Sequence, residues 1–236
     1  MAEIEKTFVV EKVCPICEQT FRVVKTRSRI AVSKRDEDGC THYEDFNPYY
    51  YTIWVCENCG FAADEDTFTT KIPDRHLTIL RAVLLTKNIK IPFVKERTLE
   101  NAATAYRLAL KYLDLIRGKA SKKAKYAHRL AWIYRAAGDK AQEDEFLTKA
   151  AEFYEDALMR ESFPIGELTD NAVIYIVAAI YNRLGDRKKA TSYLSRLISD
   201  QGVREREPRI HDKARDLWSD MRAARKKPSA WRCHPP

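Results

Sequence analysis

The sequence predicts an α+β fold, mainly α, in which a small cysteine-rich β module precedes an array of antiparallel helical pairs. Five of the six cysteines lie in the first 70 residues, beside the β-prone runs FRVV and YYYTIWV. From about residue 71 onward, apolar residues recur with the period of an amphipathic helix. Glycine and proline interrupt that pattern at short intervals. We therefore expect one domain at 1–70, a second at 71–227 and a disordered tail at 228–236.

The composition is typical of a soluble protein. Of 236 residues, 45% are hydrophobic and 32% are charged, which is enough apolar material for a core. No stretch approaches the roughly 20 consecutive apolar residues of a membrane-spanning helix. The N-terminal run MAEIEKTFVVEK is charged and lacks the apolar stretch of a secretory signal. We therefore expect a cytoplasmic protein without membrane contact, whose cysteines stay reduced.

The net charge of +8 is divided unevenly along the chain. Residues 1–70 contain 8 Lys and Arg against 13 Asp and Glu, a net charge of −5. The remaining residues contain 34 Lys and Arg against 21 Asp and Glu, a net charge of +13. This difference in charge between an acidic head (residues 1–70) and a basic body (the remaining residues) affects which partners the protein attracts, and it does not predict the fold.

The β module is the first element of the chain. FRVV and YYYTIWV predict two strands, and SKRDEDGCTHYEDFNP between them is interpreted as a long connection. A module of about 60 residues buries too little apolar surface to be stable by itself. A bound metal ion would supply the missing stability.

Four cysteines in two Cys-x-x-Cys pairs predict that metal ion. Cys14 and Cys17 are separated by 38 residues from Cys56 and Cys59. Four thiolates form the tetrahedral sulfur shell that Zn²⁺ takes at structural sites. Gly60, directly after the second pair, allows the backbone to turn away from the site. The prediction is one structural zinc ion.

Two alternatives to zinc remain in the sequence. Paired cysteine knuckles also describe rubredoxin-like iron sites, but nothing in the chain indicates an electron-transfer partner, so zinc is favoured over iron. A redox-active Cys-x-x-Cys pair opens a helix within a βαβ pattern, and no such pattern is visible here.

Two further Cys and His pairs are weaker candidates. Cys40 and His42 lie in the long connection and are candidates for an additional metal site or for substitute ligands. The competing interpretation is that they are loop residues packed beside the module, because four cysteines already fill a zinc shell. Cys233 and His234 fall in the terminal AWRCHPP, where we expect a disordered tail.

The ends of the expected helices are marked by glycine, aspartate and proline residues. Gly138 and Gly185 each end one helix, and the aspartate that follows begins the next. A third break contains Gly118, and Pro164 and Pro208 lie in the remaining interruptions. The expected helices lie near residues 74–86, 98–116, 121–137, 140–160, 169–184, 187–200 and 208–225.

These helices carry signs of an internal repeat. Tyr181 precedes the turn residue Gly185 by four positions, and Ala190 follows it by five. Gly138 has a tyrosine at the same offset, but Glu143 stands where the small residue is expected. A spacing of small, aromatic and small residues lets paired helices approach closely. It recurs at Ala102, Tyr106 and Ala109 and at Ala150, Tyr154 and Ala157.

The array resembles the tetratricopeptide repeat in degenerate form. The turn glycine followed by aspartate and the small and aromatic spacing match that repeat, whereas its Trp-Leu-Gly signature is largely missing. The last copy has Ile174, Val177 and Ala178 at those places. The alternative is a plain helical bundle with accidental glycine spacing.

Read together, the two halves resemble the bacterial domain-of-unknown-function family 2225. The resemblance covers roughly residues 10–200, and NPYYYTIWVCENCGFAA is its most specific block. It implies a zinc-ribbon-like head joined to tetratricopeptide-like helices in a cytoplasmic bacterial protein. It implies no activity, because that family is itself uncharacterised.

The sequence does not indicate an enzyme. It contains no glycine-rich phosphate loop, its histidines are scattered, and a four-cysteine shell leaves no open position on the metal. Glu152, Glu155 and Asp156 cluster on one helical turn, which is typical of a solvated face.

Three functions from different classes remain, and the least favoured of them is an enzyme with a concealed site or a metal-dependent sensor. The favoured one is a scaffold whose helical groove receives a protein or peptide segment. The alternative is a zinc-ribbon protein that binds nucleic acid through the basic body. The sequence does not indicate an oligomeric state. The residues expected to form the basic patch are Lys119, Lys122, Lys123, Lys125, Arg187, Lys188 and Lys189.

Overall fold

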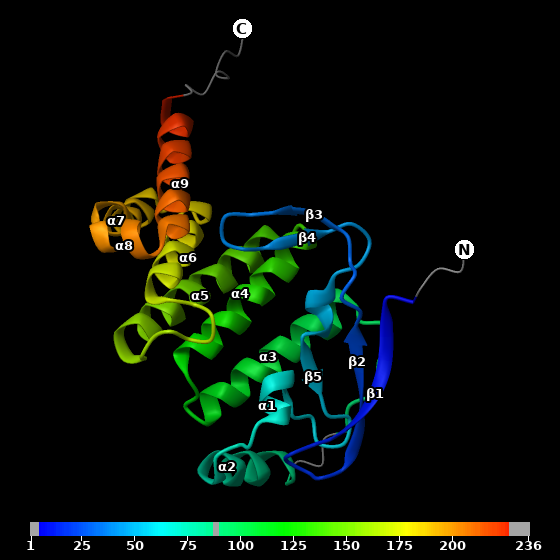
Figure 1. Ribbon diagram of the computed structural model, residues 1–236. Helices are drawn as coiled ribbons and strands as arrows, with labels where there is room; N and C mark the ends of the chain where they lie inside the picture. The colour runs from blue at the N-terminus through cyan, green and yellow to red at the C-terminus, as the bar shows by residue number, and fades with distance from the viewer. Residues whose placement is uncertain (1–4, 87–89, 227–236) are drawn as a thin grey trace, which may run out of the picture. The chain divides into compact units, whose positions relative to one another are not determined.

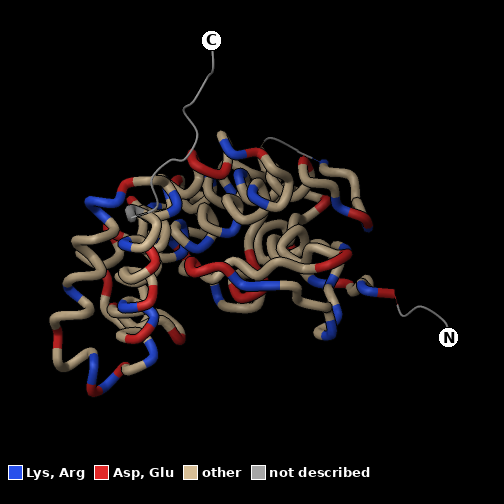
Figure 2. The backbone as a smooth tube through the Cα atoms, turned by 90° about the horizontal axis from the view of Figure 1, so that it is seen from above, with Lys and Arg blue, Asp and Glu red and all other residues tan. Residues whose placement is uncertain are grey.

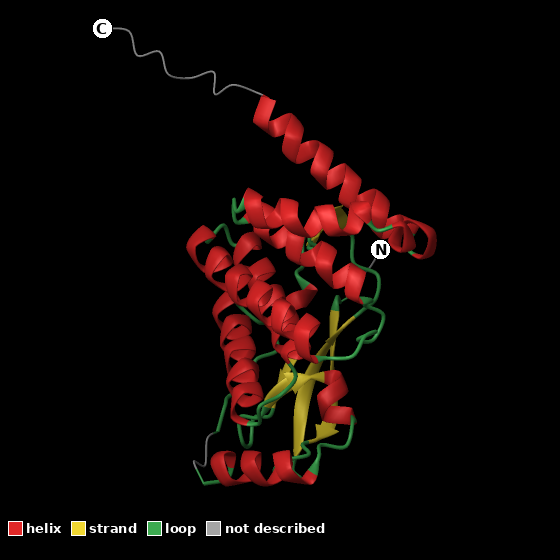
Figure 3. Ribbon diagram, turned by 90° about the vertical axis from the view of Figure 1, so that its left-hand side faces the viewer, coloured by secondary structure: helices red, strands yellow, loops and turns green. Residues whose placement is uncertain are grey.

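The computed structural model describes residues 5–86 and 90–226, and their contacts form two compact units. The first unit contains residues 5–35 and 40–153, and the second contains 36–39 and 154–226. Most of the described chain is helical, and the strands are short and antiparallel (Figure 3). The predicted α+β, mainly α class is therefore confirmed. The boundary at residue 70 stays a prediction about which segments fold independently, and the expected tail at 228–236 lies outside the described residues.

Three two-stranded antiparallel ladders occur in the first unit. The two predicted strands are present, but each pairs with a neighbour that the sequence did not reveal. The segment interpreted as a long connection contains the middle ladder, so that interpretation was wrong in part. The ladders are β1 (Thr7–Val13) with β2 (Thr20–Thr26), β3 (Val32–Arg35) with β4 (Thr41–Tyr43), and β5 (Ile53–Val55) with β6 (Ala62–Asp64) (Figure 1).

The run YYYTIWV is a strand only at its end. Its beginning belongs to the 3₁₀ helix η1 (Pro48–Tyr51). Asn47 caps this turn, because its side-chain oxygen accepts a hydrogen bond of 3.0 Å from the backbone N–H of Tyr49. Proline is accommodated at the first position of a helix, where no backbone N–H is needed. Local capping therefore overrides the β propensity of the tyrosines.

All seven expected helices are present, with ends within two residues of the predicted ones. Two short helices, α1 and α8, were not expected. The helices are α1 (Glu65–Thr69), α2 (Asp74–Leu84), α3 (Leu99–Leu115), α4 (Ala120–Ala136), α5 (Lys140–Arg160), α6 (Asp170–Arg183), α7 (Arg187–Ser199), α8 (Gln201–Arg206) and α9 (Pro208–Lys226).

The predicted helix boundaries form by the expected mechanism. Gly138 and Gly185 have φ of 75° and 84°, the left-handed conformation that ends a helix. The side chains of Asp139 and Asp186 each accept a hydrogen bond of 3.0 Å from the backbone N–H three residues later. At the third break, the left-handed residue is Arg117, with φ of 50°, rather than the glycine after it.

Each unit has its own core. In the first unit, α3 packs along the β5–β6 hairpin (Figure 1), and the rings of Phe61, Phe68 and Tyr112 meet there. In the second unit, α6, α7 and α9 surround a core of small and branched residues. The members of that core are Ile174, Tyr175, Ala178, Ala179, Leu194, Leu197, Val203, Ala214 and Leu217.

The residues of the proposed repeat lie in these cores. Each small and aromatic residue that marked the spacing is buried. Glu143, which departs from the pattern, is 3% exposed at its side chain and pairs with Arg135, whose side chain is 5% exposed. Helix α3 packs against α4 in the first unit and α6 against α7 in the second, while the repeat array and its membership in the tetratricopeptide class stay predictions. Within 5–86 and 90–226, no helix combines the length and apolar character that crossing a membrane requires.

Candidate metal centre

The four cysteines lie in the turns of two hairpins of the first unit. Cys14 and Cys17 follow β1, and Cys56 and Cys59 follow β5. In both hairpins six residues separate the last pair of the ladder, Val13 with Thr20 and Val55 with Ala62 in the two registers. Two turns of equal length therefore present their sulfurs to one point.

The backbone follows the same path in both turns. The N–H of the first cysteine donates to the carbonyl five residues later, at 3.0 Å for Gln19 and 2.8 Å for Phe61. The carbonyl of that cysteine accepts from the N–H four residues later, at 2.9 and 2.8 Å. The donors are Glu18 and Gly60, and both have positive φ, 61° and 77°. The freedom expected of Gly60 is used, and Glu18 adopts the same conformation without being glycine.

The distances between sulfurs fit a tetrahedral ion. Bonds of about 2.3 Å from Zn²⁺ to sulfur place the corners of a tetrahedron about 3.8 Å apart. The Sγ atoms of Cys14 and Cys59 are 3.7 Å apart, as are those of Cys17 and Cys56. All four sulfurs lie within 4.8 Å of one another. A disulfide requires about 2.05 Å, so these cysteines are free thiols, and their sulfurs are close enough together to hold one metal ion.

The cysteines of the cluster change one another's pKa values. Hydrogen bonding with Cys56 raises the pKa of the Cys14 thiol, and contact with Cys14 raises the pKa of Cys59. Hydrogen bonds with Cys14 and Cys59 lower the pKa of Cys56, so thiolate charge gathers on this sulfur. A divalent metal ion would offset two of the four negative charges that four coordinating thiolates carry. Four sulfurs fill the tetrahedron and leave no open coordination position, which is the pattern of a structural site.

Side chains from α2 and α3 hold the two turns in place. Arg81 donates from Nε to the carbonyl of Ile16 at 3.0 Å, and its guanidinium lies 2.5 Å from the Glu18 carboxylate. Tyr112 donates from its hydroxyl to the carbonyl of Gly60 at 3.1 Å. These outer contacts were missed from the sequence, because more than 50 residues separate the partners and no spacing marks them.

A second link joins the two turns through the strands. The guanidinium of Arg22, on β2, contacts the carboxylate of Glu57 in the second turn at 3.2 and 2.9 Å. The side chain of Asn58 donates to the carbonyl of Thr20 at 2.9 Å. The first hairpin is therefore attached to the second by contacts beside the sulfurs.

Cys40 and His42 stand apart from the four-cysteine cluster. Cys40 is buried just before β4, and His42 is half-buried within that strand. The Cys40 sulfur and a His42 ring nitrogen lie within 4.8 Å of each other. Two ligands do not complete a structural zinc shell, which takes four. An additional site here stays a prediction. Cys233 and His234 lie outside the described residues.

The residues of the predicted basic patch are largely engaged with other side chains. Lys122 and Lys125 contact Asp64 at 3.1 and 3.2 Å, and Lys123 contacts Asp114 at 2.6 Å. Lys119 is the residue before α4. Arg187, Lys188 and Lys189 form the first turn of α7. Figure 2 shows basic and acidic residues interspersed along the described backbone. Binding of nucleic acid stays a prediction.

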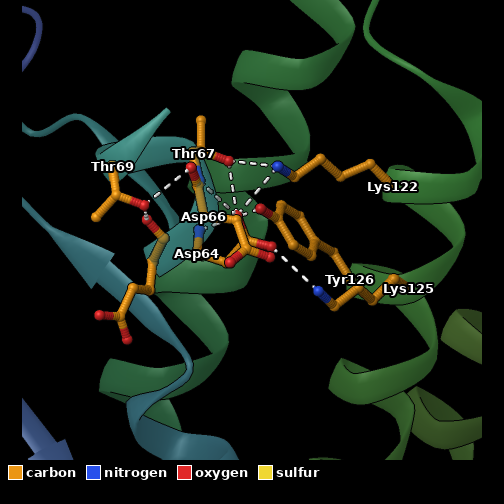
Figure 4. A network of polar contacts seen from close by, with 8 residues as sticks. Asp64, Asp66, Thr67, Thr69, Lys122, Lys125 and Tyr126 are labelled. Atoms are coloured by element: carbon orange, nitrogen blue, oxygen red, sulfur yellow. Dashed lines mark hydrogen bonds and ion pairs between the residues drawn. The ribbon is translucent and has the colours of Figure 1, made fainter. Parts of the chain in front are cut away.

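A buried carboxylate lies directly after β6. Asp64 caps α1, with its Oδ1 accepting from the backbone N–H of Thr67 at 3.2 Å and from the Thr67 hydroxyl at 2.6 Å. Its backbone N–H donates to the hydroxyl oxygen of Tyr126 at 3.1 Å. Lys122 and Lys125 on α4 approach the same carboxylate (Figure 4). The network ties the end of the hairpin that carries Cys56 and Cys59 to the helical part of the first unit.

The charge of Asp64 is stabilised by its partners. Burial by itself raises the pKa of this carboxyl, but the Thr67 hydrogen bonds and the charges of Lys122 and Lys125 outweigh it. The pKa of Asp64 therefore lies below its ordinary value of 3.8. Burial and the nearby Asp64 charge raise the pKa of Tyr126, which stays neutral.

Asp64→Asn is expected to lower the free energy of unfolding by about 2–3 kcal/mol at neutral pH. Removing one partner of a buried pair costs about 3–5 kcal/mol. Partial exposure of the lysines, 29% for Lys122 and 39% for Lys125, reduces that cost. Urea unfolding measures it. The matched control is Asp114→Asn, whose carboxylate is 62% exposed and whose loss is expected to cost less than about 1 kcal/mol.

Comparing wild type with Asp64→Asn at different pH values gives a second test. Because the folded-state pKa of Asp64 is depressed, its contribution is present above the unfolded value near 3.8 and is lost as pH falls through the folded value. The difference between wild type and Asp64→Asn should therefore be constant near neutrality and shrink in acid below about pH 4. Both proteins keep the same cysteines, so release of metal in acid affects them alike. A difference that grows in acid would contradict the assignment.

Comparison with known proteins gives one match. The model of the family described as "Uncharacterized protein conserved in bacteria (DUF2225)" matches residues 8–221, which include both cysteine pairs and the helices from α1 into α9. Neither the curated proteins nor the solved structures contain a match to the chain.

Proposed function

This chain belongs to the uncharacterised bacterial family DUF2225, and we propose that it is a non-enzymatic interaction scaffold with a structural zinc ion. The zinc ion would hold the two N-terminal hairpins together. The helical array would bind a peptide segment of a partner protein. The observation that carries this proposal is a groove between α7 and α9, in the second unit.

Zinc is the metal that best fits the four-cysteine site. The sulfurs fill a tetrahedral shell, and zinc needs no redox partner to remain bound. Iron at the same sulfurs would give similar distances, so the geometry alone does not separate the two metals. Metal analysis of the purified protein is expected to return about one zinc per chain. Stoichiometric iron with the visible absorption of an iron–thiolate centre would contradict the choice of zinc.

The groove has an apolar floor and a positive rim. Its volume is about 690 Å³, and Ile198, Ala223 and the partly exposed Trp218 supply apolar surface. Arg215 and Arg222 line it, seven residues apart on α9. Seven residues are two helical turns, so both arginines lie on the same face as Trp218. The remaining lining residues are Ser195, Ser199 and Ser219.

The charges of the groove favour an acidic partner. No aspartate or glutamate is among its lining residues, and neither Arg215 nor Arg222 forms an ion pair within the described chain. Helical grooves bind extended or helical segments through spaced apolar anchors. We expect a segment with an apolar side chain against Trp218 and carboxylates that reach the two arginines. Complementary charge would guide that segment to the groove.

Labelled peptides of fixed length test this proposal by fluorescence polarisation. One peptide carries a central leucine flanked by glutamates, and its control carries lysines in their place. The glutamate peptide is expected to bind, and Arg215→Glu with Arg222→Glu is expected to weaken it at least about tenfold. The matched control reverses Arg204 and Arg209, which are exposed arginines outside the groove. Equal binding by both double variants, or no binding at all, would overturn the proposal.

The same assay separates nucleic acid from peptide. A labelled DNA duplex and a single strand are titrated across a salt series. Binding that falls steeply with salt, together with no binding of the glutamate peptide, would favour a nucleic-acid function for the basic body instead.

A further inference from the structure

The first unit contains a cleft that plays no part in the metal centre or in the groove on α9. It has a volume of about 360 Å³ and is formed by β2, η1, β5, the start of α1 and the face of α4. None of the four ligand cysteines lines it. The volume falls at the lower end of the range for small-molecule sites, about 300–1,000 Å³. The residues that matter for its chemistry are Lys25, Tyr43, Tyr49, Lys125 and Arg129.

Most of the charges in this cleft neutralise one another. Lys25 contacts Glu65 at 2.8 Å, and Lys125 contacts Asp64 at 3.2 Å. Asp66 also lines the cleft but is exposed, so solvent and salt screen its charge. Arg129 is half-buried on α4 and forms no ion pair within the described chain. One guanidinium in the cleft therefore has no compensating carboxylate.

A second uncompensated cation lies behind the same wall. The guanidinium of Arg97 donates to the carbonyls of Tyr50 and Ile53, at 3.0 and 2.6 Å, and lies 5.9 Å from the ring centroid of Tyr51. Burial lowers the pKa of Arg97. It has no carboxylate partner among the described residues. Tyr51 lines the cleft, so the guanidinium that lies against its ring is a second positive charge close to the cleft.

Aromatic side chains form the wall beside Arg129. Tyr43 and Tyr49 line the cleft, both are half-buried, and their rings meet edge to face at 5.6 Å. The Tyr49 hydroxyl accepts the backbone N–H of Thr41 at 3.2 Å and is hydrogen-bonded to the Tyr43 side chain, so the two rings are held in place. A positive planar guanidinium beside aromatic surface suits a ligand that has both a ring and an oxyanion.

We propose that this cleft binds a small aromatic molecule that carries one oxyanion, a carboxylate or a phosphate, with Arg129 as the anion-binding residue. The guanidinium would pair with two oxygens of the anion. The exposed parts of Tyr43 and Tyr49 would contact the ring. This proposal does not depend on the scaffold function, because cleft and groove lie in different units.

The test uses the full zinc-loaded chain and four simple probes. Phenyl phosphate and benzoate carry a ring with a phosphate or a carboxylate, inorganic phosphate has the anion without the ring, and phenol has the ring without the anion. Calorimetry measures affinity, and amide NMR shifts report whether residues around Tyr49 and Arg129 respond. We expect at least one of the two ringed anions to bind more tightly than both inorganic phosphate and phenol. The stronger of the two identifies the preferred oxyanion.

Three variants locate the anion. Arg129→Gln removes the charge and is expected to weaken the ringed anion at least about tenfold, the scale of a lost charge-assisted pair. Arg129→Lys keeps the charge but loses the planar fork and is expected to weaken it less. Lys111→Gln, an exposed residue of α3 outside the cleft, is expected to change nothing.

Each other outcome contradicts the proposal. Failure of both ringed anions to bind at millimolar concentration would remove the site. Unchanged binding in Arg129→Gln would remove the role of that arginine. Equal affinity for inorganic phosphate and phenyl phosphate would remove the aromatic part of the ligand.

Discussion

Cys56→Ser is expected to cost the protein its metal ion and the fold of both cysteine turns. Structural zinc sites contribute about 10–16 kcal/mol of apparent binding free energy at pH 7, whereas a whole domain is stable by about 5–15 kcal/mol. Arg81 on α2 and Tyr112 on α3 contact the turns directly. We therefore expect loss of order to spread from the hairpins into α2 and the C-terminal half of α3.

Hydrogen exchange followed by mass spectrometry measures that spread. Amides of β1, β2, β5 and α2 should exchange much faster in Cys56→Ser, while α6, α7 and α9 should keep their protection, because they share a separate core. The matched control is Cys40→Ser, a buried cysteine outside the cluster, which should keep one metal ion per chain. Equal loss of protection in α6 and α7, or full metal retention in Cys56→Ser, would contradict this account.

Glu143→Ala is expected to lower the free energy of unfolding by about 3–5 kcal/mol, the cost of removing one partner of a buried ion pair. Arg135 donates from Nε to the Glu143 carboxylate at 2.7 Å, and the two side chains are only 5% and 3% exposed. The variant would remove the Glu143 carboxylate from its contact with a buried guanidinium. Urea unfolding in the presence of zinc measures the effect.

Two comparisons make the result specific. Glu145→Ala, two residues away, removes a pair with Lys149 whose side chains are 46% and 45% exposed, so it should cost less than about 0.5 kcal/mol. Replacing both buried partners, Arg135→Met with Glu143→Leu, should recover most of the loss, because no charge is then left unpaired. A double variant as unstable as Glu143→Ala would show that the pair is not the cause.

The helical part of the fold could be predicted because its signals are local. A turn glycine followed by a capping aspartate fixes a boundary within a few residues, and Gly138 and Gly185 act in that way. The strands were harder. Ala62 and Ala63 have little β propensity and form β6 only because β5 pairs with them. Such pairing depends on the partner rather than on the segment itself.

The four cysteines of the candidate site could be predicted from the sequence, but the side chains that hold their turns in place could not. Two Cys-x-x-Cys pairs predict a cluster of four sulfurs, because the two-residue spacing brings both sulfurs of a pair to the same side of a turn. No motif in the sequence around these residues predicts the ion pair between Arg81 and Glu18 or the one between Arg135 and Glu143. Glu143 appeared only as a departure from the repeat. A charged residue at a small-residue position was the available signal, and a nearby arginine explains it.

The equal turns at the ends of two hairpins have a consequence for the unfolded chain. A metal ion that stayed on both turns would cross-link Cys17 to Cys56 in the way that a disulfide does, and would so restrict the unfolded ensemble. For closed loops between 15 and 100 residues, such a restriction is worth about 3–5 kcal/mol. This value rises only with the logarithm of loop length. The segment around β3 and β4 could therefore be lengthened or shortened considerably with little change in the entropy that the cross-link removes.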